Sequence, residues 1–396
     1  MSGGRTVNIL TRVGEAIGRV WPWKNKSKLF FFFPFYQVGG AEKVHADIAA
    51  CVADYRPWLF FIYKSENENF KHLFEKHGRL FNLSSLINNR YAYYVCLGAL
   101  KTFINRQDEA LVFGSNNLFF YDLLPHLKKS VRRIDLLHNF GGGIEQVSLP
   151  FVHEIDTRVI CIARTLSDLK AQYAAHNVDP QLLNRVELIE LQVRVPDYYP
   201  EKHESQTLKA LYVGRASEEK RVHLVAEAAR RCQEKGIRAE FVFVGVMKSE
   251  LDSRYHNSGT FKGLIADPVA LDEIYDRADV LVLTSIYEGT SLVVMEAMAH
   301  GVVPVSTNVG GISTHVEGGV NGLLIDSIDE EEIVSSLVTI IERLALDRTS
   351  GKEMSRRADE YARQHFTVSK FCAAYRQLLL AEGPLMEKRS SDGHGS

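Results

Sequence analysis

Short, unbroken apolar runs recur along this chain and alternate with stretches of helical periodicity. Residues 29–33 form a continuous apolar run that ends at Pro34, which is typical of a strand buried on both faces. The stretch 41–53 follows it with the spacing of a helix. Further strands of this half are expected at residues 58–63, 110–113, 134–137 and 159–162. Strands that alternate with helices predict a parallel sheet with right-handed crossovers.

The second half of the chain repeats this pattern. Strands are expected at residues 210–213, 240–244, 280–284, 303–306 and 322–325, and the clearest helices at 221–235 and 291–300. Two such series predict an α/β protein of two doubly wound, Rossmann-like domains that face a central cleft, where the ligands of parallel sheets bind. The expected parts are a basic segment 1–28, an N-terminal domain 29–200, a C-terminal domain 201–366, a helix 367–387 that returns to the N-terminal domain, and a disordered tail 388–396.

Composition and charge narrow the class of protein. The 396 residues are 45% hydrophobic and 24% charged, and 47 basic against 49 acidic side chains leave a net charge of -2, which disfavours a nucleic-acid partner. No apolar run is long enough to cross a membrane, and the N-terminus lacks the pattern of a secretory signal. The five cysteines are widely spaced and odd in number. They predict neither a metal site nor a disulfide framework and indicate a reducing, cytoplasmic location.

The N-terminal segment departs from this neutral balance. Its first 28 residues hold six basic side chains and one acidic side chain, a net charge of +5. Apolar residues recur at helical spacing, with Arg12 and Arg19 on other faces and Trp21 and Trp23 beside them. Such a basic amphipathic helix over residues 5–28 predicts peripheral contact with the cytoplasmic face of a membrane. The alternative is a helix packed on its own domain.

The most informative segment runs from a predicted strand into a predicted helix. Gly289 relieves the backbone at the turn, and Thr290 or Ser291 is placed to cap the helix. Glu288 precedes the helix and Glu296 lies inside it, so a rise of ~1.5 Å per residue separates the carboxylates by roughly the span of a diphosphate. One carboxylate could accept from a sugar hydroxyl and the other from a ribose. The alternative is a core acid satisfied by backbone or by an arginine.

Two further loops offer phosphate-binding chemistry. Gly214 ends the first strand of the second half, Arg215 follows at its tip, and Lys220 stands near the next helix. A guanidinium fork and an ammonium suit a pyrophosphate, although neighbouring glutamates also fit a solvated charged loop. Gly39 and Gly40 open a helix after the first strand, which lets a ligand approach backbone N–H groups. This pattern matches neither a dinucleotide fingerprint nor a P-loop.

These residues together resemble the retaining GT-B glycosyltransferases of family GT4. The seven residues between Glu288 and Glu296 look like the family's E-x7-E motif, and Gly214-Arg215 with Lys220 resembles its diphosphate-binding pair. The similarity is densest over residues 210–326 and weaker over residues 29–193.

Three more pieces carry the resemblance. Residues 39–42 (Gly-Gly-Ala-Glu) resemble the family's glycine-rich loop, and His138, at the end of a predicted strand, resembles its cleft histidine. Residues 309–324 look like the segment after the motif, but Ser313, Thr314 and His315 stand where the family often has an acid and a proline.

The resemblance implies a metal-independent hexosyltransferase of EC class 2.4, without a cofactor. It would move a sugar from a nucleoside-diphosphate donor such as UDP- or GDP-sugar to a saccharide or lipid-linked saccharide, with retention, in cell-surface polysaccharide or lipopolysaccharide synthesis. The implied catalytic residues are His138, Glu288, Arg215 and Lys220. The implied donor-binding residues are Gly39, Gly40, Gly214, Arg215, Lys220, Gly263, Leu264, Glu288, Gly289, Thr290, Ser291 and Glu296.

Each of these residues has an expected role. Arg215 and Lys220 would offset charge on the departing diphosphate, as electrostatic stabilisation of a leaving group requires. Glu288 would hold sugar hydroxyls, Glu296 the ribose, and His138 the sugar or the reacting region. Backbone near Gly263 and Leu264 would recognise the base.

Two other functions fit the same frame. One is a non-catalytic GT-B scaffold that binds a partner, and the other is a nucleotide-sugar hydrolase or epimerase. The sequence does not name the sugar, the base, the acceptor, the linkage or the oligomeric state.

Overall fold

The computed structural model describes residues 2–20, 27–200 and 206–381, with side chains from residue 6 onward. The chain divides into two compact units, one of residues 1–189 with 372–396 and the other of residues 190–371. The stretch 190–200 therefore belongs to the second unit. The predicted tail 388–396, like Trp21 and Trp23, lies outside the described residues.

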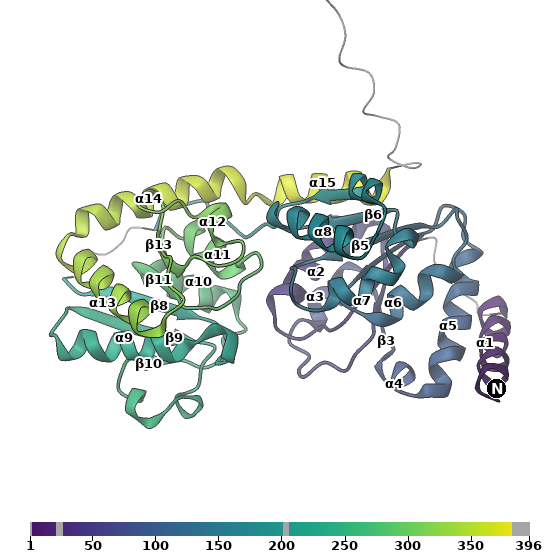
Figure 1. Cartoon of the computed structure of the whole chain (residues 1–396), viewed down its shortest axis with the longest axis horizontal. Coiled ribbons are helices and arrows are strands. Elements are labelled where there is room, and N and C mark those ends of the chain that lie inside the picture. The colour runs from purple at the N-terminus through teal and green to yellow at the C-terminus, as the bar shows by residue number, and fades with distance from the viewer. Residues whose placement is uncertain (1, 21–26, 201–205, 382–396) are drawn as a thin grey trace, which may run out of the picture. The chain divides into compact units, whose positions relative to one another are not determined.

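The first unit is built on a seven-stranded parallel sheet, of order β3-β2-β1-β4-β5-β6-β7. Its strands are β1 Leu29–Phe33, β2 Trp58–Phe61, β3 Arg79–Asn82, β4 Leu111–Ser115, β5 Arg132–Leu137, β6 Thr157–Ile160 and β7 Val186–Leu188. Its helices are α1 Ser2–Val20, α2 Gly40–Cys51, α3 Lys71–His77, α4 Ser84–Ile87, α5 Arg90–Asn105, α6 Leu118–Leu123, α7 Ile144–Ser148 and α8 Arg164–Ala175 (Figure 1). Helix α15, Val368–Leu380, enters this unit at Cys372.

The second unit holds a six-stranded parallel sheet, of order β10-β9-β8-β11-β12-β13. Its strands are β8 Leu208–Val213, β9 Ala239–Val244, β10 Thr260–Phe261, β11 Val280–Leu283, β12 Val303–Thr307 and β13 Leu323–Ile325. Its helices are α9 Val222–Glu234, α10 Pro268–Arg277, α11 Leu292–Ala299, α12 Ile312–His315, α13 Glu330–Leu346 and α14 Arg348–His365. The predicted α/β class with two parallel sheets is confirmed.

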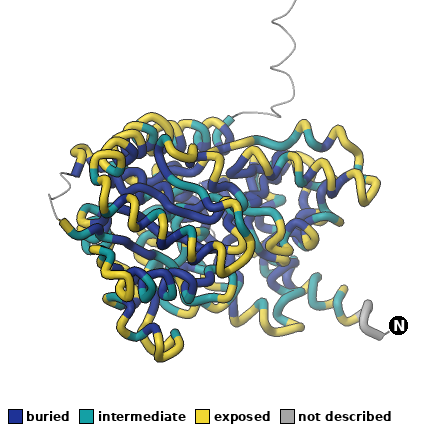
Figure 2. Tube along the Cα trace, turned by 60° about the vertical axis from the view of Figure 1, so that its left-hand side comes forward, coloured by how far each residue is buried: buried dark blue, intermediate teal, exposed yellow. Residues whose placement is uncertain are grey.

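The apolar runs become strands because both faces of each sheet are covered. All five residues of β1 are buried, and alternate side chains enter different layers. Phe30 packs edge-on against Phe103 of α5, with ring centroids 5.5 Å apart, whereas Phe33 stacks on His45 of α2 at 4.3 Å. Figure 2 shows the same partition along the chain, with buried residues gathered on the strands and on the inner faces of the helices.

A disulfide corrects one expectation from the sequence. Cys51, the last residue of α2, is bonded to Cys372 in α15, across 321 residues of sequence. Arg376, one turn further along α15, binds both carboxylate oxygens of Asp54 and the carbonyl of Cys51. The prediction of no disulfide was wrong because widely spaced cysteines meet when a terminal helix returns to the first unit. Because disulfides are typical of oxidising compartments, the cysteines no longer favour a reducing one.

Helix α1 packs along α5 through backbone contacts (Figure 1). A Cβ atom on Gly14 or Gly18 would overlap carbonyl oxygens of α5, and one on Gly98 would overlap the carbonyl of Thr11. The ammonium of Lys101 in α5 lies 2.6 Å from a carboxylate oxygen of Glu15, which adds an ion pair between the two helices. The helix thus does pack on its own domain, as the alternative reading held.

The packing of α1 leaves its outer side uncovered in the described residues. Ile9, Val13 and Val20 are 62%, 48% and 79% exposed and follow one another along a helical stripe. Arg12 and Arg19 are exposed beside this stripe. None of the described helices is long and apolar enough to span a bilayer.

Candidate functional site

The loop after β8 carries the two predicted cations and rests on a buried tyrosine. Tyr212 donates its hydroxyl hydrogen to the carbonyl oxygen of Arg215 at 3.0 Å, and its burial raises its pKa. A Cβ on Gly214 would come within 2.9 Å of that hydroxyl oxygen, so only glycine fits without a shift. The hydrogen bond from Tyr212 therefore fixes the backbone of this loop, from which the side chains of Arg215 and Lys220 extend.

Lys220 and Glu288 meet across two loops. The ammonium of Lys220 lies 2.8 Å from a carboxylate oxygen of Glu288, which also accepts from Ser285 at 2.6 Å. Glu288 is buried, whereas the Lys220 side chain is one-quarter exposed. A buried carboxylate of this kind is tolerated because it is paired and hydrogen-bonded. The structure thus joins two predicted residues that lie 68 positions apart.

Arg215 occupies the same loop but a different environment. Its side chain is 83% exposed, and its guanidinium lies 3.6 Å from Glu219. An exposed pair of this kind is weak, so the fork is free to reorient toward an anion. Of the two predicted cations, Lys220 is held beside Glu288 and Arg215 faces solvent. The solvated-loop alternative thus describes Arg215 in this structure.

Arg221 is a structural residue of the site that the sequence analysis missed. Its backbone adopts a left-handed conformation, with φ of 45°, and its side chain is buried. The guanidinium donates to the carbonyl of Thr284 at 2.8 Å, and the Thr284 hydroxyl donates to the carbonyl of Arg221 at 2.9 Å. These reciprocal bonds tie the β8–α9 loop to the β11–α11 loop. In the sequence, Arg221 looks like one more surface cation next to Lys220.

The turn before α11 is tightly packed. A Cβ on Gly310, where φ is 58°, would overlap the carbonyl oxygen of Glu288. The Thr290 hydroxyl is buried without a hydrogen-bond partner among the described residues. Ser291 is the N-cap residue of α11, but its side chain makes no capping bond, contrary to the expectation for this position. Thr290 and the N-terminus of α11 thus offer polar groups to an anion.

Glu296 lies on α11 and is satisfied from the neighbouring helix. The hydroxyl of Tyr275, in α10, donates to one carboxylate oxygen at 3.1 Å, and burial of Tyr275 raises the pKa of that phenol. The Tyr275 ring stacks on His300, whose Nδ1 lies 2.7 Å from Asp276. A tyrosine hydroxyl is thus one partner of Glu296, which the sequence analysis did not anticipate.

The predicted base-binding segment lines a hollow of about 320 Å³. Gly263, where φ is 63°, accepts from the N–H of Gly245 at 2.7 Å, so the ends of β9 and β10 are joined. The hollow is lined by Met247, Lys248, His256, Gly259, Phe261, Lys262 and Gly263. Leu264 is exposed beyond it.

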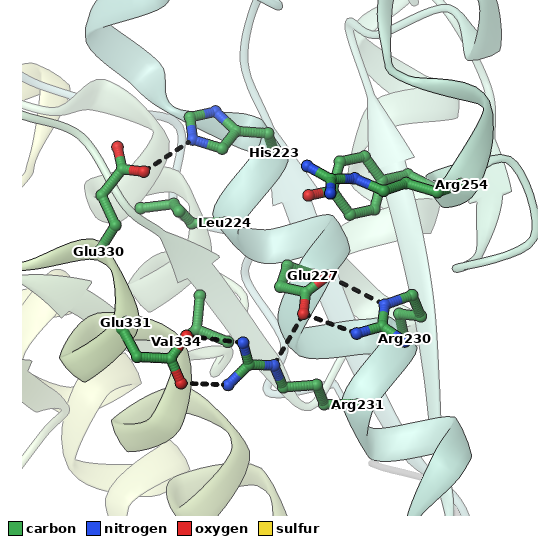
Figure 3. Close-up of a pocket in the computed structure, with 10 residues that line it drawn as sticks. His223, Leu224, Glu227, Arg230, Arg231, Arg254, Glu330, Glu331 and Val334 are labelled. Atoms are coloured by element: carbon green, nitrogen blue, oxygen red, sulfur yellow. Dashed lines mark hydrogen bonds and ion pairs between the residues drawn. The ribbon is translucent and has the colours of Figure 1, made fainter.

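A second hollow, of about 400 Å³, lies between α9 and α13 (Figure 3). Two of its arginines are already paired with acids, because Arg231 bridges Glu227 and Glu331 while Arg230 also binds Glu227. None of the predicted donor-binding residues lines it. We therefore infer that the ion pairs in this hollow join α9 to α13 and that the hollow is not the donor site.

In the first unit, the glycine loop and His138 lie in the loops that follow β1 and β5. The carboxylate of Glu42 folds over Gly39, where a Cβ would overlap it. His138 is half-buried, and its Nε2 lies 2.9 Å from Nε2 of His45 on α2. Burial lowers the pKa of His138 to about 4, so its ring is neutral at pH 7.

Comparisons with known proteins show which family the second unit matches. The family model "Glycosyl transferases group 1" matches residues 207–343, which include all the predicted donor-binding residues of the second unit. The greater part of the second unit thus matches the group 1 glycosyltransferase family. Among its relatives, mannosylfructose-phosphate synthase of Agrobacterium fabrum is 34% identical over 32% of this chain and 26% of its own length. A D-inositol 3-phosphate glycosyltransferase of Corynebacterium efficiens is 28% identical over 43% of this chain and 42% of its own length.

Solved glycosyltransferase structures share the fold of this chain over nearly its whole length. Anabaena HepE, solved in complex with UDP and glucose, covers 90% of this chain and 100% of its own, with a TM-score of 0.69 and 18% identity. The curated relatives are matched over less than half of their own length. The GT-B fold therefore extends over the chain, and the match to the group 1 family lies within the second unit.

The burial of His315 predicts an effect of pH on the stability of the fold. The residue is buried at the end of α12, with Nδ1 3.3 Å from the Tyr361 hydroxyl, and burial lowers its pKa to about 4. Histidine in an unfolded chain has a pKa near 6.5. At any pH between about 4 and 6.5, the unfolded chain therefore binds a proton at this residue that the folded chain does not. Acidification from pH 7 to pH 5 should therefore cost about 2 kcal/mol of unfolding free energy through this residue.

Urea unfolding at both pH values tests the effect. His315→Asn should make the loss between pH 7 and pH 5 smaller by about 1–2 kcal/mol. The same exchange at exposed His72 is the control. An unchanged pH difference in His315→Asn would contradict the assignment.

Proposed function

We propose that this group 1 glycosyltransferase transfers a sugar from a nucleoside-diphosphate donor to a saccharide or lipid-linked saccharide. The observation that carries the proposal is the contact between Lys220 and Glu288 next to Thr290 and the start of α11. A cation, a carboxylate, a hydroxyl without a partner in the described part of the chain and a helix N-terminus are the groups that a diphosphate and a sugar require. The solved HepE complex with UDP-glucose supports this choice of donor class.

The proposed reaction retains the anomeric configuration and uses no metal. The acceptor oxygen bonds to the anomeric carbon on the face that the diphosphate leaves, and the carbon–oxygen bond to the diphosphate breaks with its electron pair. The acceptor proton passes to the departing phosphate oxygen. In this scheme Lys220 and Arg215 offset the growing negative charge, while Glu288 holds sugar hydroxyls. Glu296, which also accepts a hydrogen bond from Tyr275, would accept from the ribose.

Further assignments complete the proposal. His138 would bind the donor sugar or the reacting region, and the loops of Gly39 and Gly40 would supply backbone N–H groups. The hollow beside Gly263 would take the base. The cellular role proposed is cell-surface polysaccharide or lipopolysaccharide synthesis, which the fold of the lipopolysaccharide outer core galactosyltransferase WaaB supports at a TM-score of 0.66.

Ligand-dependent stabilisation tests the donor class. A diphosphate that binds the folded chain raises its unfolding temperature, so UDP, GDP and ADP and their sugars are screened in parallel. The proposal is supported if the nucleotides of one base raise the unfolding temperature of the wild type and raise that of Lys220→Met less. Failure of all three to bind would favour a non-catalytic scaffold, and donor consumption with water as sole acceptor would favour a hydrolase.

We also infer that α1 contacts an anionic lipid surface. Its three sides carry different chemistry: a glycine side on α5, an apolar stripe with Ile9, Val13 and Val20, and a basic side with Arg12 and Arg19. An apolar stripe bordered by arginines suits the interface of a bilayer. The net charge of +5 in residues 1–28 adds attraction to anionic headgroups. The proposed location is the cytoplasmic face of a membrane.

Vesicle flotation tests this contact on the full chain. Ile9→Gln with Val13→Gln should reduce binding to phosphatidylglycerol vesicles at least tenfold, because two apolar side chains no longer leave water. The same exchange at exposed Val269 and Ile328, in the second unit, is the matched control and should leave binding unchanged. Binding should also weaken with salt and on phosphatidylcholine. Equal binding by both double variants would contradict the inference.

A further inference from the structure

A histidine outside the assigned machinery contacts His138. His45 is fully buried in α2, and its Nε2 lies 2.9 Å from Nε2 of His138. The two rings meet edge to face with centroids 4.8 Å apart, and the His45 ring stacks on Phe33 at 4.3 Å. The packing fixes the orientation of His45, and the bond transmits that orientation to His138.

The bond also restricts the protons of the pair. Burial lowers the pKa of both rings, so at pH 7 each is neutral and carries one proton. One Nε2 must donate and the other accept. Both Nε2 atoms are thereby committed, and Nδ1 is the nitrogen that His138 can present to a ligand.

The surroundings of His45 indicate the direction of the bond. Nδ1 of His45 is buried without a hydrogen-bond partner among the described residues. A proton on that nitrogen would be an orphaned buried N–H group, which folded proteins rarely tolerate. With its proton on Nε2 instead, His45 donates to His138. His138 then carries its own proton on Nδ1 and offers an N–H donor.

We propose that His45 is a positioning residue that makes His138 present an Nδ1–H donor to an oxygen of the sugar or the acceptor. The inference rests on the proposed transferase function for its kinetic consequence, but the tautomer itself is measurable without any substrate. An N–H donor of fixed direction discriminates among hydroxyl positions of the ligand, whereas a ring free to change tautomer does not.

Nitrogen-15 spectra of histidine-labelled protein read the tautomer directly. The signals of His138 are assigned by their loss in His138→Ala, and the wild type should show Nδ1 protonated and Nε2 unprotonated at pH 7. In His45→Phe the stacking ring stays but the donor is lost, so His138 should shift toward the Nε2–H tautomer. A wild type with the proton on Nε2 of His138 would overturn the proposal.

Kinetics provide the second readout. We expect kcat to fall about tenfold in His45→Phe while KM for the donor changes less than twofold, and His45→Gln, whose amide can donate from a similar place, should recover most of the loss. His315→Phe, a change at a buried histidine of the second unit, is the control for a new buried ring and should leave kcat unchanged. An unchanged kcat in His45→Phe, despite a shifted tautomer, would refute a positioning role. If no donor were turned over, the proposed function would fail, and the spectra alone would decide the tautomer.

Discussion

Lys220→Met is expected to lower kcat/KM by at least about 30-fold, equivalent to ~2 kcal/mol of lost transition-state stabilisation. Methionine keeps much of the apolar stem but removes the ammonium that lies 2.8 Å from Glu288. The departing diphosphate then meets one cation fewer at the moment when its charge grows. Steady-state kinetics with the donor that stabilises the wild type measure the loss.

Two further variants separate catalysis from stability. Lys220→Met leaves the buried carboxylate of Glu288 without its cation, which destabilises a fold by itself. Adding Glu288→Gln removes that unpaired charge and should recover stability without recovering kcat/KM. Arg215→Ala should also lose at least ~2 kcal/mol of transition-state stabilisation, yet leave the unfolding temperature unchanged, because its exposed pair with Glu219 is weak. Wild-type kcat/KM in folded Lys220→Met would remove Lys220 from the mechanism.

Loss of the disulfide should have the largest effect on stability. The Cys51–Cys372 bond closes a loop of 321 residues, and cross-links over long loops restrict the unfolded chain strongly. Cys51→Ser with Cys372→Ser is expected to lower the free energy of unfolding of the oxidised protein by about 2–5 kcal/mol. Urea unfolding with and without dithiothreitol measures the difference.

Two controls test whether the disulfide itself causes the loss of stability. Dithiothreitol should destabilise the wild type and leave the double serine variant unchanged. Cys232→Ala, at a buried free thiol, should respond to dithiothreitol as the wild type does. A peptide map of the unreduced protein without a 51–372 cross-link would contradict the pairing. The same map on rapidly blocked cell lysate tests location, since a reducing compartment predicts free thiols at both positions.

The buried strands and the family motif were predictable because their signals are local. The apolar run of β1 and the turn before α11 each lie within a few residues of sequence. Two edge strands, β3 and β10, gave no such signal. Strand β3 has exposed residues at both ends, and β10 has two residues, so neither forms an apolar run.

The contacts that support the site could not be predicted, because a buried polar side chain resembles an exposed one in sequence. Tyr212 supports the Arg215 loop, Tyr275 binds Glu296, and His45 binds His138. Each of these partners became evident only from its burial and its neighbour. Arg221 was hidden next to Lys220 for the same reason.

The amino-acid order by itself determined the α/β class, the two series of strands and the spacing of Glu288, Glu296 and Lys220, since periodicity and turn chemistry act over short stretches of chain. Tertiary structure decided which of these groups meet. Lys220 reaches Glu288 because two loops are tied by Arg221, and Cys51 reaches Cys372 because the last described helix returns to the first unit. Such pairings depend on packing between distant segments, which no local pattern encodes.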